Sequence, residues 1–201
     1  EIVPCDWSSD VCSSDLTDRR AGRIATDINK RIVEKMRTVK VPGVEIFVET
    51  VKEHRGIAVF RKEGLKGRLL DTDPQRLGVP PLKATTADGG ASQEMADIAN
   101  KWLAGIFEVI KDDAPANGIL TRGWCNYPEI PTYQELYGLN PACVALYAMY
   151  RGVSQFAGMK VYTEGIKDFP SKIDVLKNVW GDHDFFFFHY KHTDSAGEDG
   201  D

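Results

Sequence analysis

The sequence predicts an α/β fold with a largely parallel sheet. Stretches of helical periodicity alternate with short β-rich runs along most of the 201 residues. The last of these runs, at residues 185–188, is an unbroken FFFF, which is typical of a strand covered on both faces in the centre of a sheet. The chain is 42% hydrophobic and 27% charged, so it can bury a substantial core.

The first half is expected to contain two amphipathic helices and two neighbouring strands. Thr26 is a candidate N-cap for a helix that ends before the Val-Pro-Gly of residues 41–43. Two β-rich runs follow, at residues 44–48 and 57–60. Beyond a proline-rich passage, Ser92 is placed to cap a long helix whose apolar residues form a stripe at a period of 3.6.

The second half alternates regularly between strand and helix. Short apolar runs are expected to form strands at residues 118–122, 142–148, 159–163 and 184–190. Helical segments lie between them, near residues 133–137, 150–158 and 170–179. This alternation predicts parallel strands with crossover helices. Ligands of such sheets bind beyond the carboxyl ends of the strands.

Residues 1–16 look foreign to the rest of the chain. They show no helical or strand periodicity, and DWSSDVCSSDL at residues 6–16 matches the in-frame translation of a sequencing adapter. The segment holds four acidic residues and no Lys or Arg, so the formal charge of −5 becomes −1 without it. We expect a non-native, disordered extension of a truncated gene, and the alternative is a polar native tail.

Composition argues against several classes of function. A nearly neutral chain without a block of Lys or Arg has no electrostatic footprint for nucleic acid. The sequence contains no apolar run of the eighteen or so residues that a membrane-spanning helix needs, and no glycine-rich nucleotide-binding loop. Beyond residue 16 the cysteines are Cys125 and Cys143, which indicates reduced thiols and a cytoplasmic protein. Nothing in the sequence indicates an oligomeric state.

Polar side chains that could hold a ligand follow the last apolar strand. His189 and Lys191 share one face of an extended segment. Asp194 and Glu198 are four residues apart, close enough to reach one hard cation if the segment turns. From the spacing alone, a divalent-metal site and a solvated acidic turn fit equally well.

A second charged group lies near the start, in the TDRRAGRI of residues 17–24. Arg19, Arg20 and Arg23 place three guanidinium groups within five positions, and Asp18 can orient one of them. Guanidinium forks match phosphate oxygens in bidentate geometry, so this loop is a candidate anion site. The alternative is an ordinary solvated surface.

Several strings of the chain resemble the archaeal-type, cofactor-independent phosphoglycerate mutases, members of the alkaline-phosphatase superfamily. TDRRAGRI near the start and HxKxTDxxGxDGD at the end are the most distinctive of them. Further matching strings keep their order in between: VKEHR at 51–55, DTDP at 71–74, ANGILTRG at 116–123 and the block at 133–159. The resemblance covers essentially all of residues 17–201.

By this resemblance, one group of residues would bind the substrate, a phosphorylated three-carbon acid. The group consists of Asp18, Arg19, Arg20, Arg23, His54, Arg55 and Arg122. Arg61 is a weaker candidate for the same role, and His54 could instead be a surface residue between two strands.

The resemblance also implies a metal site and two catalytic side chains. Asp194 would bind a divalent ion with Glu198 and His189, and Lys191 and Arg151 would take part in catalysis. The family usually has His at the place of Glu198 and more often has Lys at the place of Arg151. Glu198 gives either a harder ligand set, which favours Mn²⁺ or Mg²⁺ over Zn²⁺ or Co²⁺, or a site that has lost its metal.

The family's reaction interconverts 3-phosphoglycerate and 2-phosphoglycerate in glycolysis and gluconeogenesis, without 2,3-bisphosphoglycerate. A metal-activated serine takes the phosphoryl group and returns it to the other hydroxyl. By resemblance, residues 17–127 would be an inserted α/β substrate-binding domain, and residues 128–201 part of an alkaline-phosphatase-like, metal-binding α/β domain. The nucleophilic serine would precede residue 17 and further metal ligands would follow residue 201. We therefore expect a fragment with little or no mutase activity.

Two other functions fit the same residues. One is a phosphomonoesterase of the same superfamily, in which water accepts the phosphoryl group. The other is a metal-free protein that senses phosphoglycerate through Arg19, Arg20 and Arg23, which Glu198 would favour. All three functions take a small-molecule ligand, and none of them involves nucleic acid or a membrane.

Overall fold

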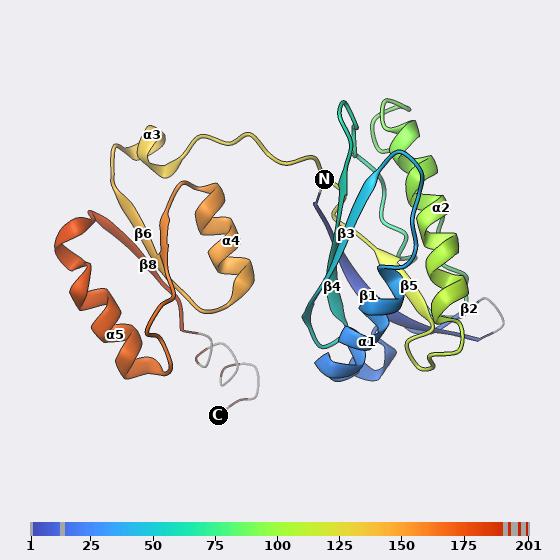
Figure 1. The fold of residues 1–201 in the computed structure, drawn as a ribbon, viewed down its shortest axis with the longest axis horizontal. Helices are drawn as coiled ribbons and strands as arrows, with labels where there is room; N and C mark the ends of the chain where they lie inside the picture. The colour runs from blue at the N-terminus through green and yellow to red at the C-terminus, as the bar shows by residue number, and fades with distance from the viewer. Residues whose placement is uncertain (1, 13–14, 191–192, 194–196, 198–199, 201) are drawn as a thin grey trace. The chain divides into compact units, whose positions relative to one another are not determined.

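The computed structural model describes residues 2–12, 15–190, 193, 197 and 200, with side chains from residue 15 onward (Figure 1). The chain divides into two compact units, Glu1–Pro128 and Glu129–Asp201. Both units combine helices with strands, so the α/β class is confirmed. Within the described part, no helix is both long enough and apolar enough to cross a bilayer.

The first unit is built on an antiparallel sheet with the order β2-β1-β4-β3, in which β5 also pairs with β1. The strands are β1 (Ile2–Cys12), β2 (Asp15–Asp18), β3 (Glu45–Lys52), β4 (Arg55–Arg61) and β5 (Gly118–Thr121). The alternation in the sequence grouped β5 with the parallel strands that follow it. That grouping was wrong, because β5 pairs antiparallel with a strand more than a hundred residues earlier.

The segment expected to be disordered contains the strand with the most neighbours. β1 pairs with β4 through residues 2–6 and with β5 through residues 5–9. The expected disorder of residues 1–16 is therefore corrected for the backbone of residues 2–12, and also for Asp15 and Leu16, which begin β2 and of which Leu16 is buried. Pairing on both sides outweighs a composition that has no strand periodicity, because strand formation depends more on neighbours than on local preference. The adapter origin of the residues stays a prediction.

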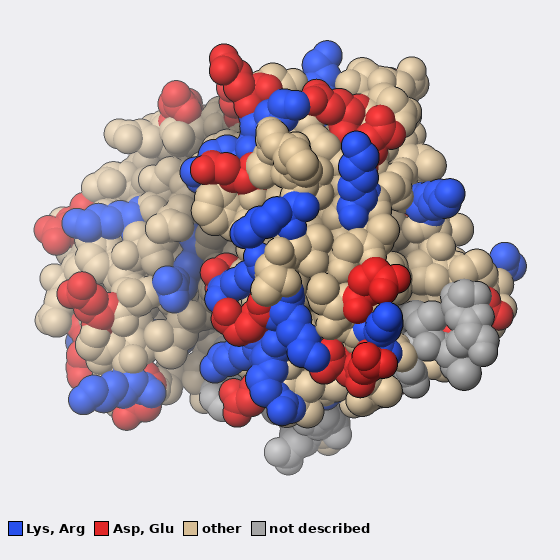
Figure 2. All heavy atoms as spheres, turned by 45° about the vertical axis from the view of Figure 1, so that its right-hand side comes forward, with Lys and Arg blue, Asp and Glu red and all other residues tan. Residues whose placement is uncertain are grey.

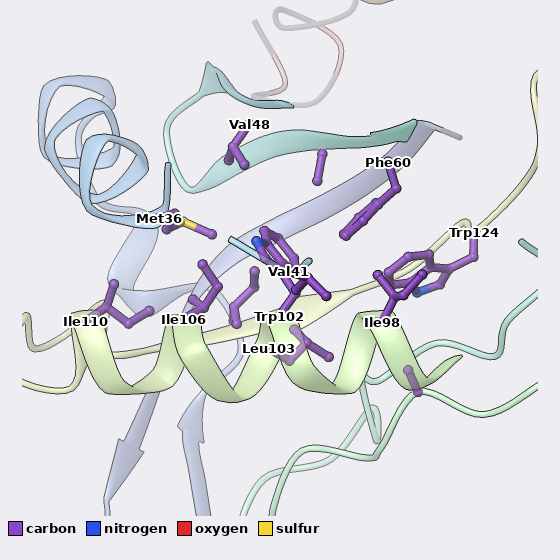
Figure 3. Packing of buried hydrophobic residues seen from close by; sticks show 14 of the residues in the cluster. Met36, Val41, Val48, Phe60, Ile98, Trp102, Leu103, Ile106, Ile110 and Trp124 are labelled. Atoms are coloured by element: carbon purple, nitrogen blue, oxygen red, sulfur yellow. The ribbon is translucent and has the colours of Figure 1, made fainter. Parts of the chain in front are cut away.

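Two helices cover one face of this sheet, α1 (Thr26–Met36) and α2 (Gln93–Ile110). Figure 3 shows Trp102 and Ile106 pointing from α2 toward the strands that carry Val48 and Phe60. The ring of Trp102 meets the ring of Phe60 edge to face, with centroids 5.2 Å apart. Both helices were expected from the spacing of their apolar residues, and this packing is the reason for that spacing.

The N-termini of the two helices differ from the expected caps. Ala25 takes the N-cap position of α1, and the hydroxyl of Thr26 instead accepts a hydrogen bond from the Glu53 amide at 3.0 Å. Ser92 is the N-cap residue of α2, but its hydroxyl accepts a hydrogen bond from the Arg68 amide at 3.0 Å and does not cap the first turn. Both hydroxyls therefore attach loops to the helices.

The second unit has a parallel sheet with the order β7-β6-β8. Its elements, in chain order, are α3 (Tyr133–Tyr137), β6 (Pro141–Val144), α4 (Ala148–Phe156), β7 (Lys160–Tyr162), α5 (Phe169–Asn178) and β8 (Phe185–Phe188). The crossovers run from β6 to β7 and then back past β6 to β8. Right-handed crossovers in opposite directions put α4 and α5 on opposite faces of the sheet, as Figure 1 shows.

The apolar strand β8 does not lie in the centre of the described sheet. β6 takes that place and is buried throughout, whereas β8 lies at an edge and is half-buried. Its rings alternate between the two faces. Phe185 stacks on Tyr133 with centroids 4.5 Å apart, and on the other face Phe186 stacks on Trp180 at 5.1 Å. The run is apolar because aromatic side chains contact it from both faces.

Candidate functional site

The arginine-rich loop of the first unit is folded by its own aspartate. Asp18 ends β2, and its carboxylate accepts hydrogen bonds from the Arg20 amide at 2.6 Å and the Gly22 amide at 2.8 Å. Ala21 and Arg23 both have positive φ, which is unusual for residues with a side chain. Asp18 therefore holds the backbone in a strained turn, and does not orient an arginine side chain as the spacing suggested.

Asp73 orients Arg19. The Arg19 Nε lies 2.9 Å from one Asp73 carboxylate oxygen and 3.1 Å from the other, and Nη2 donates to the second oxygen as well. Burial alone would raise the pKa of Asp73. The hydrogen bonds and charge of Arg19, together with the nearby Arg122 guanidinium, lower this pKa by more than burial raises it, so the net shift is downward. Asp73 is only 12% exposed, so the pair fixes one guanidinium firmly.

Two chain segments meet beside this ion pair. The Thr72 amide donates to the Thr121 carbonyl at 2.8 Å, and the Thr121 amide donates to the Thr72 hydroxyl at 2.7 Å. A second connection joins the neighbouring residues of the two segments, where the Gly123 amide donates to the Asp71 carboxylate at 3.0 Å. Arg122 lies between these two connections, and this explains how its charge reaches Asp73.

His54 lies in the turn between β3 and β4 and is 1% exposed. Its interpretation as a surface residue is therefore wrong. The pKa of Asp18 is lowered mainly by the hydrogen bond from the Arg20 amide, with a smaller electrostatic contribution from His54. The buried imidazole is thus electrostatically coupled to the arginine-rich loop.

The structure links the predicted substrate residues in two groups. Arg19 and Arg122 act on Asp73, and His54 acts on Asp18, which is next to Arg19 in the arginine-rich loop. Arg20, Arg23 and Arg55 are exposed neighbours of these residues along the chain. No ion pair joins Arg20 or Arg23 to another residue of the described ranges. On the face drawn in Figure 2, basic side chains gather in the lower middle with acidic ones among them.

The weaker candidate Arg61 lies apart from this group. It is at the opposite end of β4 from Arg55, where its guanidinium is 3.7 Å from Glu45 and covers the Phe47 ring. The seven residues of β4 span about 20 Å from one end to the other.

Asp73 was not predicted as a site residue, although it belongs to the DTDP string that carried part of the resemblance.

The charge on Asp73 makes stability depend on pH. The pKa of Asp73 is lower in the folded chain than in the unfolded chain. The ionised carboxylate therefore stabilises the fold at pH values above the unfolded pKa, and this stabilisation is lost as the pH falls through the folded pKa. We expect Asp73→Asn to lower the free energy of unfolding by about 1 kcal/mol at neutral pH, allowing for screening at the partly exposed Arg19. Urea titrations from pH 7 to pH 3 should show this difference shrinking with acidity. Asp112→Asn, at an exposed position beyond α2, is the control, and a difference that stayed constant across this range would contradict the assignment.

The second unit has a hollow of about 320 Å³ at the carboxyl ends of β6 and β8. Tyr147 and His189 line it from the ends of these strands, and Lys172 of α5 lines it from one side. The Lys172 ammonium group donates to the His189 carbonyl at 2.7 Å, and burial lowers the pKa of Lys172. A ligand position beyond the carboxyl ends agrees with the parallel topology. Lys172 was not anticipated from the sequence.

The predicted metal and catalytic residues of this unit are described only in part. Lys191, Asp194 and Glu198 lie outside the described residues. His189 is described, and its ring lies 3.9 Å from the Tyr150 ring. Arg151 is exposed on α4, and its charge acts on the buried Cys143. Among the described residues no group of three His, Cys, Asp or Glu could hold a metal ion, so they do not form a metal site by themselves.

Comparison with known proteins identifies the family. A family model described as 2,3-bisphosphoglycerate-independent phosphoglycerate mutase matches residues 7–117, which is more than half of the chain. The chain belongs to the 2,3-bisphosphoglycerate-independent phosphoglycerate mutase family. The matched residues contain the arginine-rich loop, the His54 turn and Asp73.

Curated relatives in this phosphoglycerate mutase family match nearly the whole chain. A probable 2,3-bisphosphoglycerate-independent phosphoglycerate mutase of Thermus thermophilus is 43% identical over 189 residues, covering 92% of this chain and 46% of the relative. A protein of the same name from Aquifex aeolicus is 39% identical over 191 residues, covering 92% and 47%. The chain therefore spans about half the length of the curated relatives that it matches.

Solved structures with the same fold include a cofactor-independent phosphoglycerate mutase of Thermoplasma acidophilum. It superposes with a TM-score of 0.70 at 22% identity, covering 94% of this chain and 53% of the other. A protein of Pyrococcus horikoshii superposes with a TM-score of 0.66 at 18% identity, covering 98% and 48%. At these identities the two structures support the fold of this chain and nothing further.

Proposed function

We propose that this chain is part of an enzyme that interconverts 3-phosphoglycerate and 2-phosphoglycerate, and that its first unit binds the phosphorylated acid. The observation that carries the proposal is the arginine-rich loop itself, in which Asp73 holds Arg19 with Arg122 nearby and Asp18 is electrostatically coupled to the buried His54. Family membership supports it, because the matching relatives carry the mutase name. The relatives favour this reaction over a phosphomonoesterase or a phosphoglycerate sensor.

The residues of the first unit have distinct parts in this proposal. Arg20 and Arg23 present guanidinium forks to solvent on a backbone that Asp18 holds in place, so they bind phosphate oxygens. Arg19 is fixed by Asp73 and adds positive charge. Arg122, His54 and Arg55 complete the group that neutralises and orients the acid. A preformed cationic loop lowers the entropy lost when the substrate is ordered.

The second unit, residues 128–201, contributes the metal-binding part in this proposal. Asp194, Glu198 and His189 would hold Mn²⁺ or Mg²⁺, which would stabilise charge on the transferring phosphoryl group. Lys191 and Arg151 would neutralise the same group. The described residues do not form this metal site by themselves. Residues 17–127 would be the inserted substrate domain of a cytoplasmic enzyme, of which this chain would be a fragment.

Removing the two exposed guanidinium groups should weaken ligand binding. We expect Arg20→Ala and Arg23→Ala each to raise the Kd of the 201-residue chain for 3-phosphoglycerate about tenfold, because each removes charge-assisted hydrogen bonds to a dianionic group. Isothermal titration calorimetry at low ionic strength measures the effect. Added salt should weaken the wild-type interaction, since the sites are exposed.

Arg61→Ala is the matched control, because Arg61 lies at the far end of the same strand as Arg55. Its Kd should equal that of the wild-type chain. Equal losses in all three variants would point to general charge attraction and would count against the assigned loop. A wild-type chain that does not bind 3-phosphoglycerate would overturn the proposal for the first unit.

A further inference from the structure

The turn that carries His54 and Arg55 is fastened to the start of α1 by side chains that no substrate role explains. Asn29 of α1 is fully buried. Its amide nitrogen donates to the carbonyls of Glu53 and Arg55, the latter at 3.0 Å. Its amide oxygen accepts a hydrogen bond from the Thr50 hydroxyl at 3.2 Å. One side chain thus holds three points of the β3–β4 connection.

This turn would not be fixed by its strands alone. The pairing of β3 with β4 shifts register between Thr50 and Lys52, and Glu53 has a φ of 53°, in the left-handed region. A residue with a side chain in that region is strained, so the conformation persists only where its surroundings enforce it. Asn29 and Thr26 supply that restraint. The Thr26 hydroxyl accepts a hydrogen bond from the Glu53 amide, and the Asn29 side-chain amide donates one to the Glu53 carbonyl.

The bonds also join two parts of the proposed substrate site. α1 begins directly after the arginine-rich loop, whose last guanidinium is on Arg23. The first turns of the same helix hold the backbone on both sides of His54. The distance between the loop and the imidazole is therefore set by a rigid helix and not by flexible connections.

We infer that Asn29 is a positioning residue, which fixes the His54 turn relative to the arginine-rich loop so that both contact one phosphorylated ligand. The inference rests on the proposed function of the first unit. Asn29 does not touch the ligand in this arrangement, because it is buried beneath the turn and its amide is occupied by protein groups. Its contribution is geometric, and a displacement of about 1 Å in such a group can cost up to about a hundredfold in function.

The test compares Asn29→Asp with Asn100→Asp in the 201-residue chain. Aspartate keeps the shape of asparagine but cannot donate to the two carbonyls. Asn100 of α2 is a matched control, because it also ties a loop to a helix. Its amide nitrogen donates to the Ala84 carbonyl at 2.8 Å, and its oxygen accepts a hydrogen bond from the Ala84 amide at 3.0 Å. The loop that contains Ala84 has no proposed substrate residues. Both variants should lower the Tm. Only Asn29→Asp should raise the Kd for 3-phosphoglycerate, by about tenfold or more, and shift the amide resonances of residues 53–55.

Thr26→Val keeps the test decisive if Asn29→Asp does not fold. It removes only the acceptor for the Glu53 amide, and it should raise the Kd in the same direction by a smaller factor. Wild-type affinity in folded Asn29→Asp or in Thr26→Val would overturn the positioning role and leave the proposed function standing. Equal loss of affinity in Asn100→Asp would also overturn it, since general destabilisation would explain the effect. Failure of the wild-type chain to bind 3-phosphoglycerate would overturn both.

Discussion

Deleting residues 1–12 is expected to abolish the cooperative unfolding transition of the first unit. β1 pairs with β4 on one side and with β5 on the other, so its removal leaves both strands without their shared neighbour. The lost pairing should cost more than about 5 kcal/mol, which is comparable with the whole stability of a small domain. Circular dichroism during thermal unfolding, with hydrogen exchange of the β4 and β5 amides, measures the loss.

A milder variant separates pairing from chain length. Cys5 is opposite both Gly56 and Thr121, so Cys5→Pro removes a backbone donor at the centre of the sheet. Cys5→Ala keeps that donor and should unfold like the wild-type chain. An unchanged melting curve after the deletion would show that residues 1–12 behave as the foreign tail that their composition indicates, and that the remaining strands are stable without β1.

Replacing Trp102 by Ala should destabilise the first unit by about 3–5 kcal/mol. The side chain is completely buried in the core between α2 and the sheet, and its ring meets Phe60 edge to face. Alanine would leave a cavity that the surrounding helix and strands can close only in part. The midpoint of urea unfolding should fall while the slope stays constant, because the same surface is exposed on unfolding.

Leu77→Ala is the control for this substitution. Leu77 is 56% exposed in the same unit, so its truncation should change the free energy of unfolding by less than about 0.5 kcal/mol. Trp102→Phe should have an intermediate effect, since phenylalanine fills part of the space. A loss below about 1 kcal/mol for Trp102→Ala would mean that the core relaxes around the gap, contrary to the dense packing around this ring.

The helices of the fold could be predicted because their signals are local. The apolar stripes of α1 and α2 repeat within a few residues, and the structure has both helices close to the expected bounds. Strand partners depend on residues far along the chain. The pairing of β5 with β1 and the edge position of β8 were therefore missed, although both segments were correctly predicted as strands.

The candidate site was predictable to a similar extent. Charged residue types in a distinctive string pointed to the arginine-rich loop, and the structure links Arg19 and Arg122 through Asp73 and His54 with Asp18. The residues that hold them in place were missed. Asp73 is 54 residues from Arg19, and Asn29 is 26 residues from Arg55. Their spacing along the sequence carries no periodic signal, so only the folded chain shows the connections.

The central place of β1 has a consequence for synthesis on the ribosome. During synthesis β1 leaves the exit tunnel before β4 and β5, which end at Arg61 and Thr121, so it stays without its full pairing until β5 has emerged. Loop closure over such separations is slow. Chaperones that shield extended segments would therefore act on this unit before its last strand emerges.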